Sequence, residues 1–457
     1  MSRARTLAVL AALLLAAALC GLHSIRSPLG RDFSGYQSSF FALSASQYDR
    51  HGLTRWNGYP ALEEGSPCIG GMDDLVQAHD ARGSALVYRN HPPTAFWLGY
   101  LGIAATGGDF RSPQRHRMAA LPFLAAHLLT LLAMWWWLAA PFGAGRALLG
   151  TLAAASTPIA LHSGALPNLE NPALPGVVFA LGAWARWQDQ PRARWLVCSA
   201  LGLAAASCVT FAPLFFAGAM ALATRNRRAG ALLLVAALLP LLLHAWNAQP
   251  LGALNTGSLS SRPLELLRPM IDGSLPPWRW LSIQLQHLAQ SAGLPWLIVG
   301  LAGAWFAPRR ALLAVTGGML LYWLAFYRHT AEEQWQFQLW ITPLIGLCAA
   351  AVLTRLPQRT AWISAVALAL FGVFGALRME ARLQQHALPA PEQSAQALRA
   401  LVPEGATALL PAAAGKDLSY AYQSNRDLRP ASHEAQGVRR ASLRLAWDPE
   451  RGWHCPR

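Results

Sequence analysis

Long apolar runs separated by short polar, arginine-rich segments dominate this chain. The first run covers residues 6–25, about 20 residues, which is enough to cross the roughly 30 Å hydrocarbon core of a bilayer. A signal peptide is the competing interpretation, but this run exceeds the usual 7–15 apolar residues. Further crossings are predicted at 117–138, 146–162, 172–185, a hairpin over 195–223, 230–246, 290–306, 311–327, 338–354 and 360–377. The pattern predicts an all-α polytopic membrane protein with about eleven transmembrane helices.

Three segments with apolar side chains are not predicted to be single crossings. As one helix, 195–224 would be about 43 Å long, too long for the hydrocarbon core, so we predict a turn near 207–213. The run 94–106 is too short to cross and is predicted to be interfacial or re-entrant. Residues 33–48 carry aromatic side chains at helical spacing, which predicts a second interfacial helix with its rings in the headgroup region. A soluble core helix is the alternative for that segment.

Composition agrees with a membrane protein, since 54% of residues are hydrophobic and only 13% are charged. The net charge of +15 comes mainly from arginine clusters between alternate apolar runs. Thirteen arginines then fall on one side of the membrane, against a single acid, Asp189. Cytoplasmic loops carry such an excess. The sequence therefore predicts a bacterial inner-membrane protein with its N-terminus in the cytoplasm and its C-terminus outside, and nucleic acid is not needed to explain the charge.

Two parts of the chain are predicted to lie outside the membrane. The transmembrane module covers 1–377 and includes a long outer loop at 26–116; the polar tail 378–457 forms a small outer α/β domain. Within this tail a helix is predicted over 391–401 and a strand over 406–410. Cys68 and Cys455 would both face an oxidising compartment and can form a disulfide between loop and tail.

The acidic residues argue against a transporter. None of the 22 falls inside a predicted crossing, whereas ion-coupled and proton-coupled transporters place carboxylates within the bilayer. All of the acidic residues except Asp189 lie on the predicted outer side, in the loops and the tail. Asp32 and Glu170 differ from the others because each lies within a few residues of a crossing. Both are candidates for chemistry at the membrane surface.

The order of several short motifs supports this interpretation. An outer acid follows the first crossing, a surface helix comes next, a second surface helix starts with His-Pro-Pro, and another acid follows the third crossing. A later His is followed by an aromatic stretch that ends before a Thr-Pro crossing. The residues are Arg31-Asp32-Phe33, the helix over 36–51, Asn90-His91-Pro92-Pro93-Thr94, Glu170, Arg328-His329-Thr330, and Trp340-Ile341-Thr342-Pro343. Over about residues 1–360 the chain resembles the GT-C glycosyltransferases, especially protein O-mannosyltransferases and lipid A aminoarabinose transferases.

The resemblance implies transfer of a sugar from a polyprenyl phosphate to an acceptor hydroxyl on a lipid, glycan or protein, with inversion. Asp32 would act as the general base, and Glu170 as the second catalytic acid. The donor phosphate would need cationic side chains nearby. The candidates at the outer boundary are Arg89, His91, Arg328 and His329.

No cofactor is expected. A divalent metal at Asp73-Asp74 or Glu63-Glu64 is possible but not favoured, because neighbouring loop acids are usually solvated. Two other functions stay open: a transporter or flippase of a lipid-linked glycan, and a non-catalytic membrane protein on a decayed transferase fold. The second is open because relatives carry Asp-Glu where this chain has Asp32-Phe33.

The predicted topology can be tested with reporter fusions. Fusions after Asp189 and Arg310 should report the cytoplasm, and fusions after Glu170 and Arg378 the outer side, because arginine-rich loops remain in the cytoplasm. Paired reporters, one active on each side, would measure this. An outer signal after Asp189 would contradict the assignment.

Overall fold

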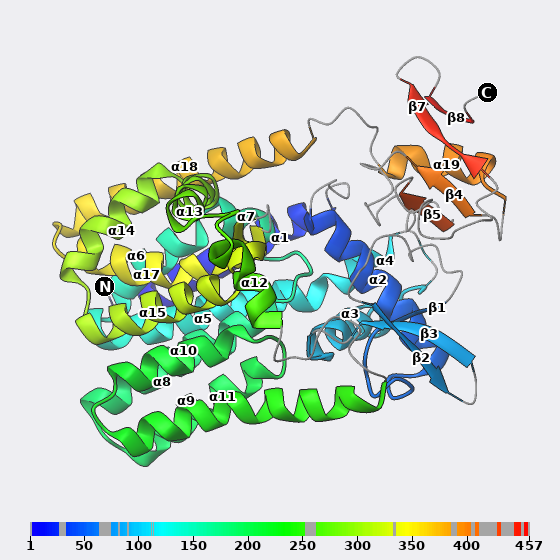
Figure 1. The fold of residues 1–457 in the computed structure, drawn as a ribbon. Coiled ribbons are helices and arrows are strands. Elements are labelled where there is room, and N and C mark those ends of the chain that lie inside the picture. The colour runs from blue at the N-terminus through cyan, green and yellow to red at the C-terminus, as the bar shows by residue number, and fades with distance from the viewer. Residues whose placement is uncertain are drawn as a thin grey trace. The chain divides into compact units, whose positions relative to one another are not determined.

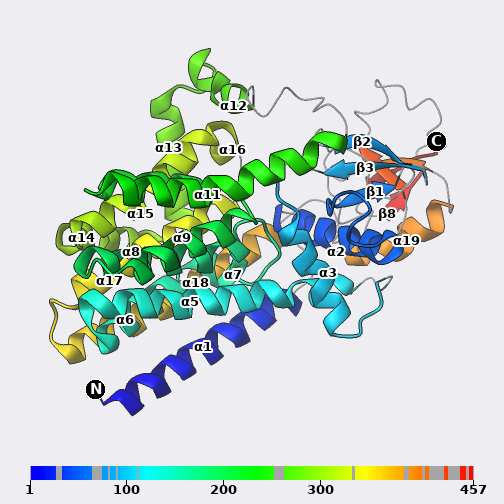
Figure 2. The ribbon, with the colours of Figure 1, turned by 90° about the horizontal axis from the view of Figure 1, so that it is seen from below.

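The computed structural model describes residues 2–26, 33–63, 75–80, 83–88, 91–110, 112, 114–251, 262–331, 335–384, 391–403, 407–410, 427–430, 443–448 and 452–455. The chain forms two compact units. The first contains residues 1–25, 123–246 and 257–380, and the second contains 26–122, 247–256 and 381–457. The ribbon is shown from two directions at 90° to each other (Figures 1 and 2).

The first unit consists of helices, most of which run side by side in both views (Figures 1 and 2). They are α1 (Arg3–Arg26), α5 (Leu121–Phe142), α6 (Ala144–Ala155), α7 (Pro158–Ser163), η1 (Asn171–Ala173), α8 (Leu174–Asp189), α9 (Ala193–Ser207), α10 (Ala212–Ala223), α11 (Arg227–Ala248), α12 (Arg262–Ile271), α13 (Pro277–Ser291), α14 (Leu294–Phe306), α15 (Arg309–Ala325), α16 (Tyr327–Ala331), η3 (Trp335–Trp340), α17 (Ile341–Leu353) and α18 (Gln358–Gln384).

A helix occupies each predicted crossing, and the predicted hairpin breaks between α9 and α10. Among the described residues, four helices are long and apolar enough to cross a membrane, or five if the bent pair α13–α14 forms one span. Many apolar side chains on the surface of this unit are exposed, among them Leu301, Trp305 and Leu370. The polytopic helical fold is therefore confirmed. The number of crossings and their sidedness stay predictions.

Residues 247–288, between the predicted crossings 230–246 and 290–306, contain helical structure that the sequence analysis did not assign. Helix α13 meets α14 at an angle of 110°, and Gly293 at the junction has φ +87°. On α13, Trp280 and Gln284 are buried whereas Trp278 and Leu281 are exposed. Helix α13 is thus amphipathic, with one face packed against the bundle.

Small residues let the helices of this unit approach closely, as is common in membrane bundles. Helix α17 packs against both α6 and α14. A Cβ at Gly303 of α14 would lie 2.1 Å from the backbone oxygen of Cys348 in α17. A Cβ at Gly150 of α6 would lie 2.6 Å from the backbone oxygen of Gly346. Both contacts require glycine because no side-chain atom fits between the backbones.

The second unit contains strands that the sequence analysis did not predict. Strands β1 (Ala61–Glu63), β2 (Leu75–Asp80) and β3 (Gly83–Tyr88) form an antiparallel sheet in the order β1-β3-β2. The register pairs Leu62 with Leu86 and Gln77 with Leu86. The first outer loop is therefore an α/β structure. The remaining helices of this loop are α2 (Phe33–His51), α3 (Thr94–Ala105) and α4 (Arg115–Ala119), with η2 (Gln249–Leu251) also in this unit.

Both predicted surface helices form, as α2 and α3, but the expected position of their aromatic rings is wrong. Phe40, Phe41 and Tyr48 are buried. Phe41 stacks on Phe96 of α3 with ring centroids 4.5 Å apart. The rings pack in a protein core rather than among headgroups because α3 provides α2 with an apolar partner. The alternative of a core helix is therefore the correct one for these rings.

The tail follows its predicted order. Its elements are α19 (Pro391–Leu401), β4 (Thr407–Leu410), β5 (Asp427–Pro430), β6 (Leu443–Arg444), β7 (Ala446–Asp448) and β8 (Gly452–His454). Strand β4 lies between β5 and β6 and is parallel to both. Helix α18 continues to Gln384, past the predicted start of the tail at 378. The separate tail domain stays a prediction.

Two glycines on α14 provide a matched test of the helix packing. Gly303→Ala should lower the free energy of unfolding by about 1–3 kcal/mol, because its Cβ would force α14 away from α17. At Gly300 a Cβ meets no atom within 4 Å, so Gly300→Ala should not destabilise the protein. Thermal unfolding in detergent measures both. Equal stability of the two variants would show that the helices do not meet at Gly303.

Candidate functional site

The loop that carries Glu170 is shaped by the side chain of Asn168. Its Oδ1 accepts hydrogen bonds from the backbone N–H groups of Glu170 at 3.0 Å and Asn171 at 2.7 Å. Its Nδ2 donates to the carbonyl of Leu166 at 2.9 Å. Short polar side chains often form such local turns. Asn171 donates to the carbonyls of Phe123 and Gly164. The loop therefore holds a single conformation with Glu170 directed inward.

The Glu170 carboxyl group is buried, with 1% of the residue exposed, and its partners come from three other segments. Tyr322 of α15 donates its hydroxyl to Oε1 at 2.7 Å. Trp340, the last residue of η3, donates its indole N–H to Oε2 at 2.8 Å. Thr210, in the turn between α9 and α10, donates to Oε1 at 3.5 Å. Each donor is uncharged, so hydrogen bonds alone compensate for the burial of this carboxyl.

Burial raises the pKa of the Glu170 carboxyl from 4.5 to about 7. The hydrogen bonds from Tyr322, Trp340 and Thr210 lower it, but the loss of water is the larger effect. Near neutral pH this loop therefore holds a group that exists in both protonation states.

The turn that carries Arg328 and His329 is held by buried polar contacts from α13. Trp280 donates its indole N–H to the carbonyl of Tyr327 and to the hydroxyl of Thr330, each at 3.1 Å. Gln284 donates to the carbonyl of Thr330 at 2.7 Å. The Trp280 ring also stacks on Tyr327, with centroids 5.0 Å apart. Helix α16 is consequently fixed to α13 on one side.

Helix α15 and η3 hold the same turn on its other side. Trp323 donates its indole N–H to the carbonyl of Phe337 at 3.0 Å. The Tyr322 ring lies 5.5 Å from that of Phe337 and 6.1 Å from that of Trp340. Since Tyr322 and Trp340 also bind Glu170, the carboxyl group joins the two segments that flank α16. Arg328 is exposed on that helix.

His91 lies in the second unit, immediately before α3. Its Nδ1 and the Tyr88 hydroxyl are hydrogen-bonded at 2.9 Å, and the two rings are stacked. Helices α2 and α3 pack together through Phe40 and Phe96 and through Tyr48 and Tyr100. The N-terminus of a helix favours anions because its first backbone N–H groups are unpaired.

Several predicted residues lie outside the part of the chain that the structure describes. Asp32, Arg89 and Cys68 are among them, although α2 begins directly after Asp32. Cys455 is described and is exposed. Because Cys68 lies outside the described residues, the disulfide between Cys68 and Cys455 stays a prediction. His329 lies in α16. Within the described ranges no group of three or more His, Cys, Asp or Glu residues is placed to hold a metal ion.

The sequence analysis missed the partners of Glu170. Thr210 was placed in the predicted turn of the hairpin, and Trp340 appeared only as part of a motif. Tyr322 gave a usable signal, because a tyrosine in an apolar run needs a partner for its hydroxyl. The sequence does not show which of the outer acids is that partner. The catalytic role of Glu170 stays a prediction.

The pKa of Glu170 predicts how the stability of the protein depends on pH. A folded-state pKa above the unfolded value adds stability that is complete below about pH 4.5 and is lost as the pH rises through about 7. The thermal midpoint in detergent should therefore fall between pH 5 and 8, by the equivalent of up to about 3 kcal/mol. Glu170→Gln should remove this part of the slope. Asp189→Asn, at an exposed carboxylate, should retain it. Identical slopes for wild type and Glu170→Gln would contradict the assignment.

Comparison with known proteins identifies the fold. No protein-family model and no curated protein matches the sequence. ArnT from Cupriavidus metallidurans, in a crystal structure bound to undecaprenyl phosphate, is similar with a TM-score of 0.59, over 96% of this chain and 88% of that chain, at 14% identity. The oligosaccharyltransferase AglB from Archaeoglobus fulgidus, in complex with an inhibitory peptide and a dolichol-phosphate, gives a TM-score of 0.54 at 13% identity. That match covers 93% of this chain and spans 64% of AglB. The predicted resemblance to the GT-C glycosyltransferases is therefore confirmed at the level of the fold.

Proposed function

We propose that this protein is a glycosyltransferase that moves a sugar from a polyprenyl phosphate to an acceptor hydroxyl at the outer face of the membrane. The observation that carries the proposal is the fold shared with ArnT over 96% of the chain. ArnT binds undecaprenyl phosphate and AglB binds a dolichol-phosphate, which are both polyprenyl phosphates. A donor of the same chemical class would keep its tail in the bilayer and present its phosphate at the surface.

Asp32 is the proposed general base. It would take the proton of the acceptor hydroxyl while that oxygen attacks the anomeric carbon from the face opposite the phosphate. The bond between the anomeric carbon and the phosphate oxygen breaks, and the phosphate leaves with the electron pair, so the configuration inverts. In the sequence Asp32 directly precedes α2.

The departing phosphate gains negative charge and needs hydrogen-bond donors. We propose Arg89, His91, Arg328 and His329 as its partners. His91 is held by Tyr88, and α16 is held by the buried Trp280, while Trp323 binds Phe337 of the following η3. Side chains on supported backbone can be placed before the charge develops, and this preorganisation makes electrostatic stabilisation effective.

Glu170 is proposed to act indirectly, by positioning the residues of α16. With 1% of the residue exposed and its oxygens bound by three donors, it does not present itself to a substrate. Its bonds to Tyr322 and Trp340 tie together the segments on either side of α16. We therefore assign it as a positioning residue for Arg328 and His329.

Replacement of Asp32 tests the proposed function. With radiolabelled polyprenyl-phosphate sugars as donors, Asp32→Asn should lower transfer by membranes about 10²–10⁴-fold, the usual contribution of a general base. Asp49→Asn, at an exposed acid on α2, is the matched control and should retain activity. Unchanged transfer by Asp32→Asn at normal expression would remove Asp32 from the mechanism. Movement of the labelled lipid across the membrane without transfer would favour a flippase instead.

A further inference from the structure

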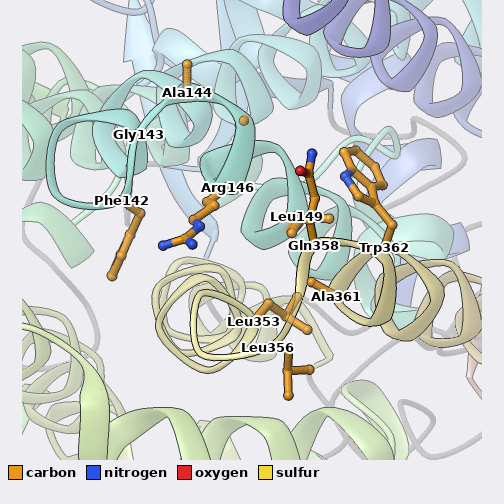
Figure 3. A pocket seen from close by; sticks show the side chains of 11 residues that line it. Phe142, Gly143, Ala144, Arg146, Leu149, Leu353, Leu356, Gln358, Ala361 and Trp362 are labelled. Atoms are coloured by element: carbon orange, nitrogen blue, oxygen red, sulfur yellow. The ribbon is translucent and has the colours of Figure 1, made fainter. Parts of the chain in front are cut away.

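A cavity lies between two helix turns at one end of the first unit. Its walls come from the turn that joins α5 to α6 and from the turn that joins α17 to α18, and it encloses about 280 Å³ (Figure 3). Apolar side chains provide most of the lining, with Trp362 at one edge. Residues that line the cavity include Phe142, Arg146, Leu149, Leu353, Gln358 and Trp362.

The charge at this cavity is entirely positive. Arg146 projects from α6 toward Phe142, with Leu353 on the α17 side (Figure 3). No described residue that lines the cavity is acidic. The exposed side chain of Arg146 makes no hydrogen bond or ion pair with any residue in the described ranges, and Arg355 and Arg359 lie close to Gln358 in the sequence. An arginine beside an apolar hollow, without a carboxylate partner, suits a phosphate group because its planar head can donate two parallel hydrogen bonds.

The backbone at the cavity adds to this preference. Helix α6 begins here with Gly143 as its N-cap, and no side chain caps it. The first N–H groups of a helix attract anions. The backbone N–H groups at the start of α6 therefore add to the attraction of Arg146 for an anion.

An apolar surface leads away from the cavity along α18. Ile363, Val366 and Leu370 are exposed on this helix within about two turns of Trp362. Their spacing of three and four residues places them on one face. A ligand that combines a phosphate with hydrocarbon chains can therefore contact Arg146 and this face together. Tryptophan at such a position is typical of the membrane interface.

We propose that this cavity binds the phosphate of an anionic phospholipid, with the acyl chains along α18. The predicted topology places it in the cytoplasmic leaflet, where basic pockets between transmembrane helices bind anionic headgroups. It would be a site for a membrane lipid that is not a substrate, and it does not depend on the proposed transferase activity. Its occupancy would clamp the α5–α6 turn to the α17–α18 turn.

The experiment uses the full-length protein in a nonionic detergent and follows its thermal midpoint. Dioctanoyl phosphatidylglycerol should raise the midpoint, whereas dioctanoyl phosphatidylcholine and inorganic phosphate should not, because only the first combines net negative charge with acyl chains. Arg146→Gln should weaken the apparent affinity about tenfold, the effect expected for loss of a charge-assisted hydrogen bond. Arg228→Gln, at an exposed arginine on α11 away from the cavity, should leave it unchanged.

A second variant keeps the charge of Arg146 and reduces the volume of the cavity. Gly145 lines the cavity, and a Cβ there meets no atom within 4 Å, so a side chain can start at this position without a clash at its first carbon. Gly145→Leu should also weaken the effect of phosphatidylglycerol while Arg146 is intact. Equal affinity in wild type and Arg146→Gln would overturn the proposal, as would equal shifts with phosphatidylcholine. A full shift with inorganic phosphate alone would show a free-anion site and overturn the lipid assignment.

Discussion

The burial of one carboxyl group constrains much of the helical unit. Folding removes Glu170 from water, and without partners this would cost several kcal/mol. The chain meets the requirement with uncharged donors from Thr210, Tyr322 and Trp340, which lie far apart in the sequence. These donors can reach the carboxyl only if α10, α15 and α17 occupy fixed positions around its loop. The network thus restricts how these helices can pack at that end of the bundle.

Tryptophan has a related role elsewhere in the same unit. Its ring packs among apolar side chains while its single N–H seeks an acceptor. Trp280 and Trp323 use that N–H to hold the segments around α16. Trp296 donates to the carbonyl of Ala153 in α6 at 2.8 Å, and Trp184 donates to Thr224 at 2.9 Å. Each bond fixes a pair of segments where apolar packing alone would permit sliding, so the bundle gains specificity as well as stability.

The second unit is ordered by the packing of aromatic rings. Its sheet and the helices α2 and α3 form an aromatic core around Phe40, Phe96 and Tyr88, with ring centroids 5.2–5.7 Å apart. This core orders the segments that follow Asp32 and precede α3. A reaction at a lipid headgroup needs such order because the loops concerned receive no support from the bilayer interior.

The sequence by itself determined the helical membrane fold, the hairpin break between α9 and α10, the surface helices and the order of elements at the start of the tail. These features follow from local apolar length and from periodicity, which depend on neighbours along the chain. It also identified Glu170 and His91 as notable positions. Only the tertiary structure decided that the rings of α2 pack on α3, that 61–88 contains a sheet, and that Glu170 binds Tyr322 and Trp340. Those contacts join residues far apart in the chain, and a polar side chain carries no local mark of which distant partner will satisfy it.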